Sequence, residues 1–170
     1  MSDLRVTTLT FDEIGEEYLQ EVLDIYNYYV LNTTVSFHTE PLGLSDMRES
    51  VLNGETRFKS FVILQGEELQ GYVLITRHKN KQAYDTSGEI SIYLKPGSTG
   101  KGIGEKALHF IEQKALELEF HVLVATVCSE NEQSRKLFRR NGYEQCAYFK
   151  EIGSKFGRRL DIASFQKILE

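Results

Sequence analysis

The feature that most constrains this chain is a glycine-dense turn between an apolar run and a helical pattern. Residues 89–94 (EISIYL) have the β-branched and aromatic content of a strand, and residues 96–104 (PGSTGKGIG) contain four glycines. Apolar residues then recur at helical intervals over residues 107–118. This order favours binding of an anion, because the first N–H groups of a helix lack intrahelical partners and the helix dipole is positive there.

Two standard phosphate-binding patterns fit this turn poorly. A Walker A loop needs a glycine where Lys95 stands, and Ser or Thr where Gly102 stands. The dinucleotide fingerprint is met loosely by residues 102–107, and it expects an acidic residue about 20 positions on. The nearest acidic residue past the next predicted strand is Glu130, 28 positions after Gly102. A plain tight connection between strand and helix stays open as an alternative.

The rest of the pattern predicts elements in the order β-α-α-β-β-β-α-β-α-β-β, with Asp12 and Ser45 as caps of the first two helices. We expect an α/β (α+β) fold in a single domain over residues 1–170, with a central mixed, twisted sheet of about six to seven strands and about four helices on its two faces. The expected strands are 5–10, 60–64, 70–76, 89–94, 122–127, 144–152 and 159–168, and the expected helices are 14–29, 45–52, 107–118 and 131–140.

The composition excludes some classes of binding partner but does not indicate an activity. The net charge of −5 argues against non-specific nucleic-acid binding, which needs a basic face. No apolar run approaches 18 residues, and the first residues lack the pattern of a secretory signal, so we expect no membrane association and a cytoplasmic protein. Cys128 and Cys146 have no CxxC partner and no histidine at ligand spacing, so we expect reduced thiols and no metal.

The glycine turn resembles the acetyl-coenzyme A loop of the GNAT acetyltransferases, Arg/Gln-x-x-Gly-x-Gly/Ala, with Thr99 at the first position. Further stretches in matching order resemble the phosphinothricin and methionine sulfoximine N-acetyltransferases of that family. They are residues 25–27 with 33–41, 83–85 with 89–94, 131–137 with 142–143, and 155–158 with 160–161, so the resemblance covers about residues 4–168.

The resemblance implies acetyl-coenzyme A as co-substrate and a set of residues that would hold it. Its pantetheine arm would lie along Ile92, Tyr93 and Leu94, and its pyrophosphate on the backbone of Thr99, Gly100, Lys101, Gly102, Ile103 and Gly104. Asn131 and Ser134 would contact the pantetheine from the following helix. Two alternatives stay open, namely that Lys101 is a solvated lysine and that Asn131 is a helix cap.

Glu89 matches the acidic residue that such enzymes are thought to use as general base. A base is needed because an amine is largely protonated at neutral pH and only the neutral amine attacks a thioester. The alternative is that Glu89 only begins a strand and faces water. The same resemblance places the substrate between Thr34 and Phe37 on one wall and Lys81 or Tyr84 on the other, where a surface loop and a core phenylalanine are the alternatives.

Three residues depart from the family pattern. Thr99 replaces the usual Arg or Gln, which puts one phosphate contact in doubt. Phe138 stands near the position where many acetyltransferases carry a tyrosine that protonates the leaving thiolate, and Arg159 replaces a tryptophan common in the closing hairpin. The four histidines are scattered and suggest neither a triad nor a metal cluster, so we interpret them as structural or surface residues.

The sequence thus predicts an acetyl-coenzyme A-dependent N-acetyltransferase for the primary amine of a small amino-acid-like substrate of the phosphinothricin or methionine sulfoximine type. Direct attack in a ternary complex is expected, because no cysteine or serine has a recognisable nucleophile setting. The alternatives are a peptide or protein N-terminal acetyltransferase and a non-catalytic acyl-coenzyme A-binding module on the same fold. A homodimer is expected from the family alone.

Overall fold

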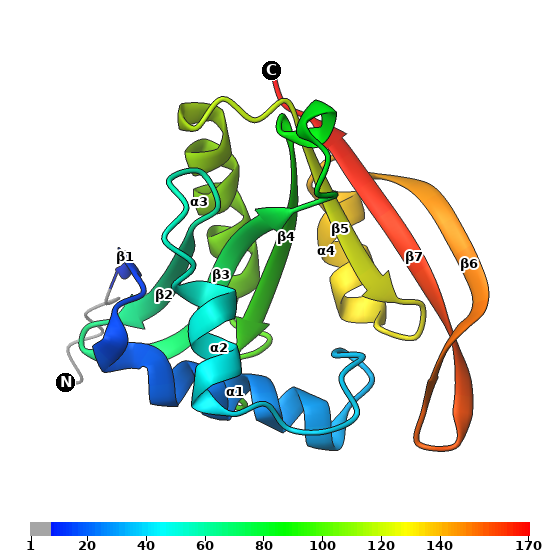
Figure 1. Ribbon diagram of the computed structural model, residues 1–170, viewed down its shortest axis with the longest axis horizontal. Coiled ribbons are helices and arrows are strands. Elements are labelled where there is room, and N and C mark those ends of the chain that lie inside the picture. The colour runs from blue at the N-terminus through cyan, green and yellow to red at the C-terminus, as the bar shows by residue number, and fades with distance from the viewer. Residues whose placement is uncertain (1–7) are drawn as a thin grey trace, which may run out of the picture.

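A computed structural model describes residues 8–170 and contains one sheet of seven strands in the order β1-β2-β3-β4-β5-β7-β6 (Figure 1). All neighbours are antiparallel except β4 and β5. The mixed sheet and four α-helices confirm the predicted fold class. The strands are β1 (Leu9–Glu13), β2 (Ser60–Gln65), β3 (Glu68–Arg77), β4 (Ser87–Leu94), β5 (Val122–Cys128), β6 (Glu144–Lys155) and β7 (Arg158–Ile168).

The helices are α1 (Leu19–Asn32), α2 (Leu44–Val51), α3 (Ile103–Glu117) and α4 (Glu132–Arg140), with short 3₁₀ turns η1 (Glu16–Tyr18) and η2 (Gln82–Tyr84). Both predicted caps were wrong. Asp12 lies in β1, opposite Val62, and Ser45 lies inside α2, whose N-cap is Gly43. The predicted first strand lies partly outside the described residues, since residues 5–7 precede them.

The helices cover the two faces of the sheet in pairs. On one face, α1 and α2 pack through Val22 and Met47 against residues of β2 and β3 such as Val62 and Tyr72. On the other face, α3 buries Leu108 and Ile111 in a second core that also contains Phe138 of α4. In Figure 1, α3 lies behind β3 and β4, and α4 lies beside β5.

The parallel neighbours β4 and β5 pair over only a short distance. Their register runs from Ser87, opposite Val122, to Glu89, opposite Val124. By contrast, β4 pairs with β3 from Gly88 to Leu94, and β5 pairs with β7 along its whole length. Among the described residues, the part of β4 beyond Glu89 therefore has no strand partner on its β5 side, and the two strands diverge into an opening (Figure 1).

The second core predicts a large difference between two leucines of α3. Leu108 is completely buried, whereas Leu116 on the same helix is 38% exposed. Leu108→Ala should lower the free energy of unfolding by about 2–5 kcal/mol, because it removes buried methyl groups and leaves a cavity. Leu116→Ala should change it by less than about 1 kcal/mol. Urea unfolding measures both, and equal losses would contradict the assigned packing.

Candidate functional site

Two cavities meet in the opening between β4 and β5. The larger, of about 450 Å³, is lined by both strands, the glycine turn and α4. The smaller, of about 370 Å³, lies toward α1 and the loop that follows it. They share Val35, Tyr93, Thr126 and Val127 as lining residues. The arrangement is a cleft that passes between the strands, with room for a long ligand at one end and a small one at the other.

Most residues predicted to hold a coenzyme come together around the larger cavity. Those that line it are Ile92, Tyr93, Leu94, Thr99, Gly100, Gly102, Gly104, Asn131 and Ser134. The side chains of Lys101 and Ile103 do not. Lys101 is exposed at the tip of the turn, and Ile103 is only 5% exposed because it packs into the core as the first residue of α3.

The glycine turn has the backbone geometry that its sequence predicts. Gly97, Gly100 and Gly102 have φ angles of 93°, 74° and 78°, which residues with a Cβ rarely adopt. Gly102 is the N-cap of α3, and its carbonyl accepts the helical bond from Lys106 at 3.3 Å. The amides of the first turn of α3 precede that bond and have no acceptor within the helix, so the turn offers N–H donors beside the cavity.

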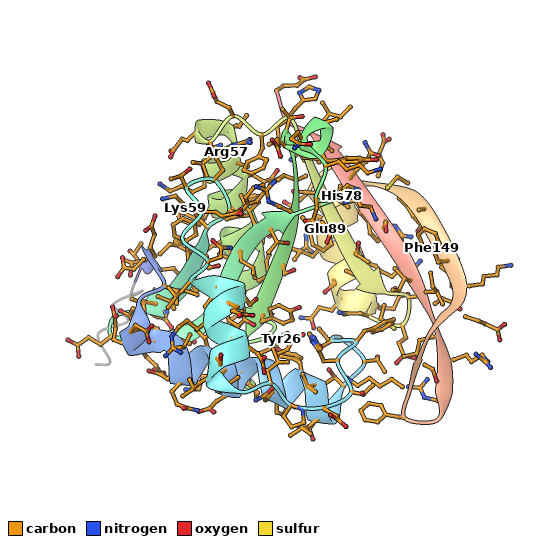
Figure 2. All side chains as sticks on the ribbon, in the orientation of Figure 1. Tyr26, Arg57, Lys59, His78, Glu89 and Phe149 are labelled. Atoms are coloured by element: carbon orange, nitrogen blue, oxygen red, sulfur yellow. The ribbon has the colours of Figure 1, made fainter. Side chains whose placement is uncertain are left out.

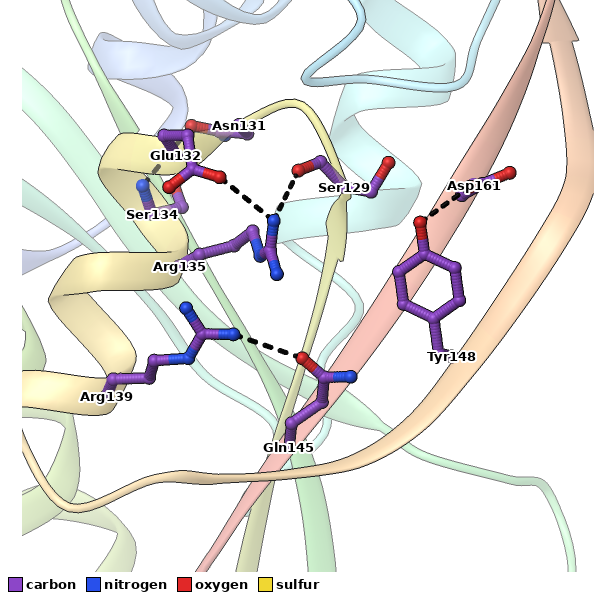
Figure 3. A network of polar contacts seen from close by, with 9 residues as sticks. All are labelled: Ser129, Asn131, Glu132, Ser134, Arg135, Arg139, Gln145, Tyr148 and Asp161. Atoms are coloured by element: carbon purple, nitrogen blue, oxygen red, sulfur yellow. Dashed lines mark hydrogen bonds and ion pairs between the residues drawn. The ribbon is translucent and has the colours of Figure 1, made fainter.

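Two basic residues of α4 add positive charge to the larger cavity. Lys136 and Arg140 line it, and Arg140 also pairs with Glu105 at 3.2 Å. Arg135 is engaged in hydrogen bonds within the protein, since its Nη1 donates to the Ser129 carbonyl at 3.0 Å and to Glu132 at 2.9 Å (Figure 3). The cavity therefore combines amide donors with cationic side chains, a combination that suits a phosphate ligand.

Asn131 has two roles in the geometry. Its side-chain oxygen accepts the backbone N–H of Ser134 at 3.2 Å, which confirms the helix-cap alternative (Figure 3). Its side chain also lines the larger cavity, as does that of Ser134. The cap therefore fixes the orientation of an amide at the wall where a pantetheine was predicted.

Glu89 lies at the last parallel pair of β4 and β5, where the opening begins (Figure 2). Its side chain is 34% exposed and its Oε1 is 3.1 Å from Nδ1 of His78. It lines neither cavity. Sequence reasoning missed this partner, because His78 follows the end of β3 and meets Glu89 only through the β3–β4 pairing.

The four residues predicted to contact a substrate lie in three different places. Phe37 lines the smaller cavity and is 37% exposed, so the core alternative is wrong for it. Tyr84 lies beside the His78–Glu89 pair, where its ring meets the His78 ring edge-on at a centroid distance of 5.8 Å, and Lys81 is the N-cap of the same 3₁₀ turn. Thr34 lines neither cavity.

Thr34 instead joins three segments at the edge of the cleft. Its Oγ1 donates a hydrogen bond to Oε1 of Glu130 at 2.5 Å. The Glu130 carboxylate also accepts hydrogen bonds from both terminal nitrogens of Arg158, each at 3.1 Å. Nearby, the Phe37 ring covers Gly153 so closely that a Cβ there would lie 2.4 Å from the ring. The loop after α1 is therefore held against the β6–β7 hairpin.

The structure shows where two of the residues that depart from the family pattern, Phe138 and Arg159, lie. Phe138 is 5% exposed, lines the larger cavity and packs against Tyr143 and Phe165 at ring distances of 5.1 and 6.2 Å, so it supplies no proton. Arg159 pairs with Ser154 in the hairpin and lines neither cavity. Cys128 is a buried free thiol that lines the smaller cavity.

Within residues 8–170, no three or more His, Cys, Asp or Glu side chains are grouped in a way that could hold a metal ion. The helices in the same range are too short or too polar to cross a membrane.

Comparison with known proteins gives matches along nearly the whole chain. Residues 22–143 match the family described as "Acetyltransferase (GNAT) family". A "Phosphinothricin N-acetyltransferase" of Streptomyces coelicolor is 32% identical over 91% of this chain and 92% of the relative. An "L-methionine sulfoximine/L-methionine sulfone acetyltransferase" of Pseudomonas paraeruginosa is 29% identical over 93% of each chain.

Solved structures agree with these matches. A "Ribosomal-protein-alanine N-acetyltransferase" from Brucella melitensis has a TM-score of 0.89 and 31% identity, over 94% of this chain and 99% of that one. A phosphinothricin acetyltransferase from Sinorhizobium meliloti in complex with AcCoA has a TM-score of 0.89 and 28% identity, over 95% and 89%.

The Glu130 cluster predicts a pH-dependent contribution to stability. Hydrogen bonding to Arg158, with a smaller effect of Thr34, lowers the pKa of the Glu130 carboxyl in the folded protein. A carboxyl whose pKa is lower in the folded state stabilises the protein at pH values above its unfolded-state pKa of about 4.3. This stabilisation is lost as the pH falls through the folded-state pKa. The free energy of unfolding of wild type should exceed that of Glu130→Gln at pH 7 and equal it near pH 2. The difference at pH 7 should be no more than about 1 kcal/mol, because the ion pair is exposed. Urea unfolding at both pH values tests this, and a difference that persists at low pH would refute it.

Proposed function

The chain belongs to the acetyltransferase (GNAT) family and is an N-acetyltransferase, and we propose that it is a single domain that transfers acetyl from acetyl-coenzyme A to the primary amine of a small amino-acid-like substrate. The observation that carries this proposal is the pair of cavities that meet between β4 and β5. The larger suits a long phosphorylated thioester and the smaller suits an amine. The thioester carbonyl and the amine nitrogen would meet where the shared lining residues stand.

Acetyl-coenzyme A would occupy the larger cavity. The free edge of β4 at Ile92, Tyr93 and Leu94 would pair with the amides of the pantetheine arm, as an added strand would. The backbone of residues 99–104 would hold the pyrophosphate, with Lys136 and Arg140 supplying positive charge. The solved complex of a 28% identical relative with AcCoA supports this assignment.

The substrate amine would occupy the smaller cavity. Its walls are mainly apolar or aromatic, with Phe37 and Ile162 among them, and a lysine or arginine is absent from the described lining. This favours an amino acid with a neutral side chain, such as methionine sulfone or sulfoximine, over one with a second anion. Lys81 and Tyr84 line neither cavity, so a substrate held there would not contact them, whereas Thr34 would fix one wall through Glu130.

Glu89 would act as general base through a bridging water, because its carboxylate lies at the start of the opening rather than in either cavity. The neutral amine would attack the thioester carbonyl, and the tetrahedral intermediate would collapse with cleavage of the C–S bond. The thiolate needs only a weak acid, since a thiol has a pKa of about 8.5. This chemistry needs no acetyl-enzyme and no metal.

Peptide N-termini are a second candidate substrate. The ribosomal-protein-alanine N-acetyltransferase is 31% identical to this chain and shares its fold. A terminal alanine has the same primary amine beside a small side chain, so the smaller cavity would accept it if the following peptide leaves toward solvent. The substrate panel below separates the two classes.

A cytoplasmic homodimer without nucleic-acid or membrane partners completes the proposal. The observation in favour of a dimer is the β6–β7 hairpin, which exposes a row of large apolar side chains. They are Tyr148, Phe149, Ile152 and Phe156, at 42–56% exposure. Sedimentation of the purified protein tests the dimer.

Glu89→Gln should lower kcat by roughly tenfold or more, because the amide cannot accept the ammonium proton. The Kd for acetyl-coenzyme A should stay within about twofold, since Glu89 does not line the larger cavity. Glu67→Gln, a change at an exposed turn residue, is the matched control and should leave both values unchanged. An unchanged kcat in Glu89→Gln would remove Glu89 from the mechanism.

A substrate panel with thiol-release detection tests the substrate class. Methionine sulfone and methionine sulfoximine should give the highest kcat/KM, phosphinothricin a lower one because of its second anionic group, and polyamines and alanyl peptides the lowest. A preference for alanyl peptides would favour the second candidate. Acetyl-coenzyme A binding with no acceptor in the panel would contradict the proposed class.

A further inference from the structure

The smaller cavity is lined by a polar cluster that the proposed chemistry does not use. Tyr26 of α1 points its hydroxyl toward two residues of the following loop (Figure 2). It is 2.8 Å from Oγ of Ser36 and is hydrogen-bonded to Nδ1 of His38. The rings of Tyr26 and His38 meet edge-on, with centroids 5.5 Å apart. A phenol between a hydroxyl and an imidazole is a pathway along which a proton can move.

The cluster contacts a residue that both cavities share. The Tyr26 ring meets the Tyr93 ring edge-on at 5.3 Å, and Tyr93 lines both cavities. Glu89 lines neither. An amine in the smaller cavity would therefore have the Tyr26 hydroxyl within the same cavity, whereas Glu89 reaches it only through water.

The reaction of the proposed function requires two proton removals from one nitrogen. The substrate ammonium becomes a neutral amine before attack, and the nitrogen loses a second proton as the amide forms. A single carboxylate accepts one proton at a time, so Glu89 must release the first before it takes the second, or another group must take one of them.

We propose that Tyr26 and His38 form this second proton-transfer pair, with Tyr26 as a catalytic residue and His38 as the residue that accepts and discharges the proton. The inference rests on the proposed function. As the tetrahedral intermediate forms, an N–H bond of the attacking nitrogen breaks and a new O–H bond forms on Tyr26. The original Tyr26 proton passes to Nδ1 of His38, and the resulting imidazolium releases a proton to solvent. The departing thiolate takes its own proton from water, so protons and charge balance.

The surroundings suit a relay. Burial raises the pKa of the Tyr26 hydroxyl, so it stays protonated and works by exchange instead of as a standing base. His38 is exposed, which gives its proton a route to solvent. The charged group that faces the cluster is the buried Lys155, whose Nζ donates to the Ser36 carbonyl at 2.7 Å. Among the other titratable groups, Tyr93 and Cys128 line the same cavity, and Tyr29 and Tyr72 contact the Tyr93 ring.

The test measures kcat and kcat/KM against pH for wild type, Tyr26→Phe, His38→Gln and the double variant, with methionine sulfone and acetyl-coenzyme A. Wild type should show an acidic limb in the pH profile of kcat, because His38 must be neutral to accept a proton. Each single variant should lose about tenfold in kcat, and the double variant should be no slower, because the two residues act as a unit. His38→Gln should also shift or abolish that limb.

Matched controls are Tyr28→Phe, on an exposed neighbour in α1, and His109→Gln, on α3, which should keep the wild-type profile. Thermal melting shows whether Tyr26→Phe folds, and the exposed His38 keeps the test decisive if it does not. Variants that change only KM for the amine would make the pair a binding contact and overturn the inference. If the Tyr26 and His38 variants keep wild-type activity and wild-type pH profiles, this inference is overturned and the proposed function stands. If wild type is inactive on every amine, the proposed function is overturned as well.

Discussion

The short parallel pairing between β4 and β5 is the constraint on which the rest of the structure depends. The two strands share a ladder only from Ser87 to Glu89, and then separate. Each half of the sheet must therefore hold itself together. One half is the β1–β4 ladder, and the other is β5 with the long β7 and β6 strands. Helix α3 packs against both through a common core, which lets the sheet open without coming apart.

The opening also explains how an acidic chain can be suited to an anionic ligand. The net charge of −5 gives no general attraction, so binding must depend on local groups. The first amides of α3, the glycines that expose them and the two basic residues of α4 supply those groups at one cavity. Backbone amides are donors whatever the overall charge, and they are already oriented by the helix. Glu105 pairs with Arg140 at 3.2 Å and so partly offsets its positive charge.

Local patterns predicted the elements well because they carry their own physical signal. The glycine turn, the α3 stripe and the cap at Asn131 were confirmed, since each depends on residues close in sequence. Asp12 was misassigned because a capping residue type near a helical stripe does not reveal that β2 recruits the segment into the sheet. The length of the β4–β5 ladder was not predictable, because no residue in either strand marks where parallel pairing ends.

Contacts between distant segments were the other part that sequence reasoning missed. His78 meets Glu89 through the β3–β4 hairpin, and His38 meets Tyr26 across the turn after α1. Both histidines were interpreted as structural or surface residues, because scattered histidines have no common motif. Thr34 was expected at the substrate, yet it lines neither cavity and its hydroxyl donates to Glu130. These placements depend on tertiary packing, which is also what orients a side chain for catalysis.

The most direct test of the central claim is amide hydrogen exchange of the whole chain with and without coenzyme A. If the opening between β4 and β5 is the coenzyme site, exchange should slow at residues 92–94, on the free edge of β4, and at residues 102–105, at the start of α3. The hairpin β2–β3, whose two strands already pair with each other, should show little change. Protection confined to other segments, or no protection at saturating coenzyme A, would contradict the account.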